Sequence, residues 1–109
     1  MRNNKMKTNL SPAEIHTFKW LYSFFDAIPA SEWCQRATKD RQKYCAIGHL
    51  TRKGNNLLEI TSLFERVSGA GLHTVNDAEY WLSSKKNEGN RAKTNVLKAL
   101  KEILNSVKE

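Results

Sequence analysis

Both cysteines of the chain lie in residues 33–50, together with a tryptophan and a histidine. Cys34, Cys45, His49 and His73 are residue types that bind zinc, and Cys45 and His49 stand four positions apart, on one face of a predicted helix. Structural zinc sites contain close pairs such as C-x2-C, and this sequence has none. The alternative is that the cysteines pack as small apolar groups. We therefore expect no metal and no cofactor.

Cys45 is also the candidate nucleophile. It precedes or begins a predicted helix, whose dipole favours a thiolate, and nearby basic residues act in the same direction. His73 and Asp77 could complete a Cys–His–Asp arrangement. A Cys45-dependent hydrolase or transferase is therefore one hypothesis, although a helical chain of 109 residues leaves little room for a substrate cleft.

Basic residues are concentrated in two segments, 34–54 and 83–101, each with a single acidic residue, in a chain of net charge +7. If the segments lie side by side, they form one positive patch that attracts nucleic acid or an acidic protein surface. An exposed Trp33 or Tyr44 would add sequence-tolerant base stacking. The alternative is two solvated lysine-rich faces. The candidate anion-binding residues are Arg36, Lys39, Arg41, Lys43, Arg52, Lys53, Lys85, Lys86, Arg91, Lys98 and Lys101.

Trp20 and Phe24 fall outside the main apolar stripe of the first predicted helix and widen its apolar arc to roughly 200°. Such a helix is either central in the domain or offers a second face to a partner. With Trp33, these residues are the candidate protein interface. This pattern suits an inhibitor, encoded by a phage or mobile element, that docks on a host protein.

The elements that must position these residues are mostly helical. Ser11-Pro12 with Glu14 is a capping box that begins a helix ending near residue 27. Further helices are predicted over 44–53, 57–67 and 91–107, with a loop over 35–43. We expect an all-α or mainly α fold, a small orthogonal bundle of four to five short helices. Residues 74–82 suit either a short helix or a strand, because Thr, Val, Tyr and Trp are common in strands. A short β-hairpin around 70–82 is therefore the alternative.

Residues 1–10 are predicted to form a disordered basic arm, and residues 11–109 a single helical domain. The N-terminus has no apolar core typical of a secretory signal, and no segment is apolar enough to cross a membrane. We therefore expect a cytoplasmic protein with reduced thiols and no membrane partner. The sequence does not specify an oligomeric state.

The succession of Trp33-Cys34, Cys45-Ala46-Ile47-Gly48, Asn76-Asp77 and Val96-Leu97-Lys98-Ala99-Leu100 resembles a set of short bacterial and phage proteins without an established activity. The resemblance spans residues 15–104. It differs at His49-Leu50, where many such sequences have Ala-Leu, and in a longer segment after Asp77. It implies a compact helical module in which Cys45, Gly48 and Asn76-Asp77 are close together. We interpret Asn76 or Asp77 as the cap of a helix beneath Cys45.

These observations favour a small, basic, non-enzymatic binding protein that recognises nucleic acid or an acidic protein surface. The docking inhibitor is the first alternative, and the Cys45-dependent enzyme is the second.

Overall fold

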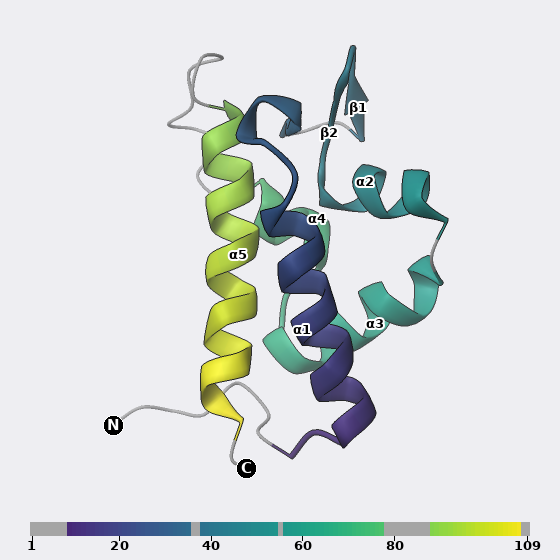
Figure 1. Ribbon diagram of the computed structural model, residues 1–109, viewed down its shortest axis with the longest axis vertical. Coiled ribbons are helices and arrows are strands. Elements are labelled where there is room, and N and C mark those ends of the chain that lie inside the picture. The colour runs from purple at the N-terminus through teal and green to yellow at the C-terminus, as the bar shows by residue number, and fades with distance from the viewer. Residues whose placement is uncertain (1–8, 36–37, 55, 78–87, 108–109) are drawn as a thin grey trace.

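The computed structural model describes residues 9–35, 38–54, 56–77 and 88–107 of the chain. The described part is mainly α-helical, as the sequence predicts, and forms a small bundle (Figure 1). Its elements are α1 (Pro12–Asp26), η1, a 3-10 turn (Ala30–Glu32), β1 (Lys39–Asp40), β2 (Lys43–Tyr44), α2 (Ala46–Lys53), α3 (Leu57–Ser68), α4 (Leu72–Asn76) and α5 (Glu88–Ser106).

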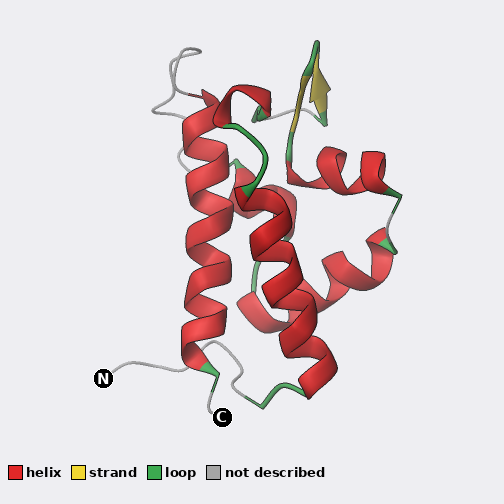
Figure 2. Cartoon of the chain, viewed as in Figure 1, coloured by secondary structure: helices red, strands yellow, loops and turns green. Residues whose placement is uncertain are grey.

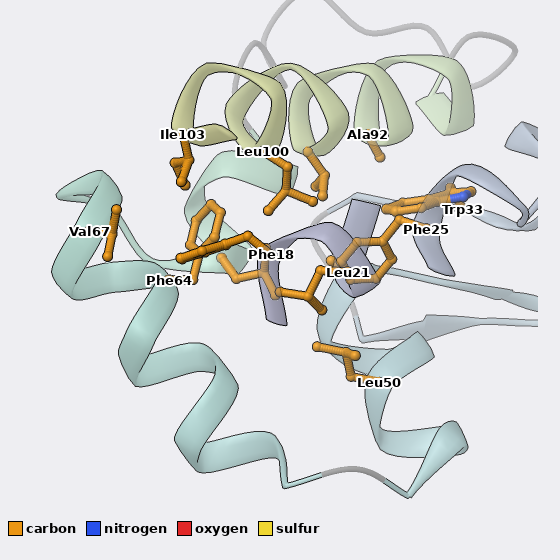
Figure 3. Close-up of a cluster of buried hydrophobic side chains, with 13 residues drawn as sticks. Phe18, Leu21, Phe25, Trp33, Leu50, Phe64, Val67, Ala92, Leu100 and Ile103 are labelled. Carbon is orange, nitrogen blue, oxygen red and sulfur yellow. The ribbon is translucent and has the colours of Figure 1, made fainter. Parts of the chain in front are cut away.

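Helices α1 and α5 run antiparallel, and the core lies between them and the helices α3 and α4 (Figure 1). Phe18, Leu21 and Phe25 recur at helical spacing on α1, so they share one face and all three are buried. Figure 3 shows them packed against the inner faces of α3 and α5. Each large apolar side chain buried in this way contributes roughly 1.5–3 kcal/mol.

Local signals set several helix ends. The Ser11 hydroxyl accepts from the Glu14 N–H at 3.1 Å, and the Glu14 carboxylate accepts from the Ser11 N–H at 3.0 Å, which is the predicted capping box. Gly54 ends α2 in the left-handed conformation, with φ of 84°. Asn56 precedes α3, but its side chain accepts no hydrogen bond from the N–H groups of the helix, and its amide N–H donates to the Glu59 carboxylate at 2.8 Å.

The strands are not where the sequence suggested. Residues 72–76 form α4, so the described part of 70–82 is helical, and residues 78–82 lie outside the described part. A hairpin of two two-residue strands occurs instead over 39–44 and stands above α2 (Figure 2); it takes up the end of the predicted loop 35–43 and Tyr44, the first residue of the predicted helix 44–53. Long-range pairing of Tyr44 with Trp33 stabilises the hairpin, and no local pattern reveals that contact.

Gly48 allows the hairpin to lie directly on α2. A Cβ atom at this position would collide with the backbone carbonyl of Thr38 and approach the Tyr44 ring to 3.1 Å. Glycine is therefore needed here for close approach, and the contact positions Tyr44 over α2.

The predicted basic arm lies outside the described part of the chain for residues 1–8, while Leu10 packs against the core. Among the described helices, none combines the length and apolar character needed to span a bilayer.

Candidate functional site

The side chain of Asn76 is fully buried at the end of α4 and connects three separate segments. Its Oδ1 accepts from the backbone N–H of Ala46 at 3.0 Å, and its Nδ2 donates to the Cys34 carbonyl at 2.9 Å and to Asp77 Oδ1 at 2.9 Å. The Gln35 amide donates to the Asn76 carbonyl at 3.1 Å. The first free N–H of α2 is thus capped by a residue thirty positions further on, which confirms the predicted capping role.

The side-chain amide of Asn76 also takes the place of one backbone hydrogen bond between the segments that contain Trp33 and Tyr44. Trp33 and Tyr44 form a parallel bridge, and the Cys34 N–H donates to the Tyr44 carbonyl at 3.0 Å. A continuing parallel ladder would next pair the Ala46 N–H with the Cys34 carbonyl. The Asn76 amide stands between those two groups and bonds to both, which keeps them satisfied while the two segments diverge.

Cys45 is buried at the N-cap of α2, and burial raises the pKa of its thiol. The N–H groups of Ile47 and Gly48 lower that pKa, as expected at a helix start, but Asp77 raises it and burial has the larger effect. Asp77 therefore opposes thiolate formation. His73 is exposed on α4, with its ring 3.4 Å from the Thr74 hydroxyl. This arrangement does not activate Cys45 as a nucleophile.

The four candidate metal ligands are placed differently. Cys34 and Cys45 are buried thiols, and His49 Nε2 donates to the Glu32 carbonyl at 2.9 Å. His73 is exposed, beside the Thr74 hydroxyl. Within the described ranges, no group of three or more His, Cys, Asp or Glu side chains is arranged to hold a metal ion.

A continuous row of aromatic rings runs from α1 to the hairpin. Trp20 stacks on Phe24 with centroids 5.0 Å apart, and Phe24 contacts Phe25 at 5.3 Å. Phe25 then meets Trp33 edge-on at 5.4 Å. His49 lies 5.1 Å from Trp33, and its other neighbour in the row is the Tyr44 ring at 5.4 Å. Burial lowers the pKa of His49, so the ring is neutral near pH 7 and behaves as part of the core.

Cationic side chains cover the outer end of this row. The Arg52 guanidinium lies 4.5 Å from the Tyr44 ring centroid, and the Lys39 ammonium lies 5.6 Å from it. Arg41 occupies the hairpin turn, exposed and with a left-handed φ of 61°. We call the basic residues of the hairpin and of the last turn of α2 the basic hairpin surface; they are Lys39, Arg41, Lys43, Arg52 and Lys53.

Six further residues were predicted to bind anions. Arg36, Lys85 and Lys86 lie outside the described residues. Arg91, Lys98 and Lys101 are on α5, which runs alongside α1 (Figure 1) and also contacts α2 and the 3-10 turn.

Trp33 was expected at an exposed interface, and this prediction is wrong. Its ring is fully buried between Phe25 and His49, and its Nε1 donates to the Ile28 carbonyl at 3.3 Å. The 3-10 turn directs this side chain inward, which spacing along the sequence does not reveal. Trp20 and Phe24 are half-buried and pack on the core with one side.

No protein-family model matches this chain, and no curated protein or solved structure matches it either.

The sequence did not predict that two cations pack on the Tyr44 ring or that the His49 ring is buried. The mixture of aromatic and basic residues over 39–52 was the only pattern that could have indicated the cation contacts. The proximity of Asn76 to the Cys45 turn was expected and is confirmed.

We predict that Asn76→Ala lowers the free energy of unfolding by about 2–4 kcal/mol, because it removes the partner of a buried N–H and one partner of a buried carbonyl. Urea unfolding measures the effect. Asn105→Ala, on the exposed side of α5, is the matched control and should change stability by less than about 0.5 kcal/mol. Equal effects of the two substitutions would contradict the role assigned to Asn76.

We also predict a pH dependence from His49. Its pKa is lower in the folded protein than in the unfolded chain, so the unfolded chain binds more protons below about pH 6.5. The stability due to a neutral His49 is therefore full above about pH 6.5 and is lost as pH falls towards the folded pKa. Urea unfolding at about pH 7.5 and about pH 5.5 should show a wild-type advantage over His49→Gln that shrinks on acidification. An advantage that stays constant or grows would be inconsistent with a neutral, buried ring.

Proposed function

We propose that the protein binds nucleic acid through the basic hairpin surface, with little sequence preference and without catalysing a reaction. The observation that carries the proposal is the cationic cover of the Tyr44 ring at one end of the molecule. Lysine and arginine gathered in this way neutralise phosphates and release counterions.

The Arg52 side chain supports nucleic acid over a generic anion. Its guanidinium is held over the Tyr44 ring, and the residue is exposed, so its outer face can stack on a base while its N–H groups reach a phosphate. Because base stacking is sequence-tolerant, this contact fits single-stranded segments of any sequence.

Arg41 supports the same proposal. A left-handed φ costs an L-residue roughly 1–2 kcal/mol, and glycine or asparagine is the usual residue at such a turn. The chain instead places a long cationic side chain there. A strained residue of this kind is a sign of a functional contact.

The contacts of Cys45 do not favour the enzyme hypothesis, since its pKa is raised and Asp77 opposes the thiolate. An acidic protein surface remains the alternative partner, because carboxylates attract the same cations. The two partners differ in that only nucleic acid offers bases to stack on Arg52.

The test is fluorescence anisotropy with a labelled single-stranded oligothymidine at about 50 mM and about 200 mM salt. We expect affinity that falls steeply with salt. Lys39→Gln/Arg52→Gln should weaken binding and flatten the log–log salt slope by about 1 to 2, since two phosphate contacts are lost.

Lys98→Gln/Lys101→Gln is the matched control, because it removes the same charge from exposed positions on α5, outside the basic hairpin surface. The proposal fails if both double variants weaken binding equally, which would indicate diffuse attraction to net charge. It also fails if polyglutamate of equal charge binds as tightly as the oligonucleotide, which would favour an acidic protein surface.

A further inference from the structure

The outer face of α3 carries an exposed apolar side chain. Leu58 is 79% exposed and is the one large hydrophobic residue of the described part that is classed as exposed. It separates two grooves, one of about 800 Å³ between α1 and α3 and one of about 370 Å³ that reaches α4. Ile60 and Leu63 line the first groove, and Leu57 and Leu72 line the second. Because Leu58 lines both grooves, it joins their apolar residues into one continuous apolar face on α3.

The charge of this region differs from that of the rest of the molecule. Helix α3 carries two carboxylates, Glu59 and Glu65, and one arginine, Arg66, whereas the whole chain has a net charge of +7. Two copies of a +7 protein repel one another at long range, and they repel least when they approach through their least basic surfaces. The α3 face is such a surface, so its charge suits a second copy of this chain.

The shape of the α3 face is also self-complementary, because a protruding side chain and the grooves that could receive it belong to one helix. A two-fold dimer requires such a surface, since the same patch is used twice. Ser62 is small, exposed and midway between Leu58 and Arg66, so two α3 helices can approach closely there.

We propose that the protein forms a weak two-fold dimer in which α3 packs antiparallel against α3 of a second copy, with the axis near Ser62. Leu58 of each copy then enters a groove of the other. Glu59 and Arg66 lie three and four residues from Ser62, on opposite sides, so each Glu59 faces Arg66 of the second copy. Arg66 already binds Glu14 at 2.8 Å through one of its donors, and its guanidinium has further donors for a second carboxylate.

This dimer is independent of nucleic-acid binding. The hairpin stands at one end of the molecule and α3 lies toward the other (Figure 2), so both basic hairpin surfaces stay accessible. The two properties also respond to salt in opposite ways. Salt screens the repulsion between two positive chains and strengthens the dimer, whereas it weakens phosphate contacts.

The test is sedimentation velocity of the full chain over a range of concentrations, without nucleic acid. We expect the apparent mass to rise from one chain towards two, and to do so at lower protein concentration when salt is raised. Leu58→Asp should remain monomeric at every concentration. The substitution places an acidic residue in the first turn of α3, where the helix dipole favours it, and circular dichroism should show an unchanged fold.

Thr94→Asp is the matched control, since it adds the same charge on the exposed side of α5 and should dimerise like the wild type. A second measurement tests the axis. In Ser62→Cys, oxidised glutathione should join two copies through a disulfide, while the glutathione is reduced to two thiols. Cys34 and Cys45 are buried and should not react.

A Thr94→Cys variant should give little covalent dimer under the same conditions. The proposal is overturned if the wild type stays monomeric throughout, which would assign the α3 face to a different occupant. It is equally overturned if Leu58→Asp dimerises as the wild type does, or if Thr94→Cys cross-links as readily as Ser62→Cys.

Discussion

The buried amide of Asn76 is the contact on which the rest of the structure depends. It is donor and acceptor at once, and it satisfies the first N–H of α2 and the carbonyl of Cys34 in a site without water contact. An unpartnered polar group in such a site costs about 1–3 kcal/mol, so a side chain with both a donor and an acceptor is needed. α4 is a five-residue helix that ends at Asn76, so it positions this side chain while its Leu72 packs in the core.

The position of the basic hairpin surface follows from that contact. Once α2 starts at Ala46, Gly48 lets the hairpin lie on the helix, and Tyr44 is held beside His49. The row of aromatic rings then connects the core to the cations. At its inner end Trp33 packs on His49, and at its outer end Arg52 packs on Tyr44. The exposed cations are thus positioned by buried packing, which reduces the entropy that they lose on binding.

The sequence predicts the helices and helix ends, because these depend on residues that are close together along the chain. The capping box at Ser11 and Glu14 was identified from residue type and spacing alone, and α2 ends at Lys53, as the predicted range 44–53 requires. Contacts between distant segments were harder to predict. The hairpin was missed because its turn has Arg41 where glycine or asparagine is the usual signal, and because Tyr44 is positioned by Trp33. Trp33 was assigned to the surface because burial depends on the 3-10 turn that precedes it.

The most direct test of the Asn76 contact is amide hydrogen exchange at Ala46. An N–H in the first turn of a helix normally has no intrahelical partner and exchanges readily. Bonded to a buried side chain, the Ala46 N–H should exchange only when the domain unfolds, with protection equal to that of the core amides of α5. Exchange at the rate of an exposed first-turn amide would contradict the account.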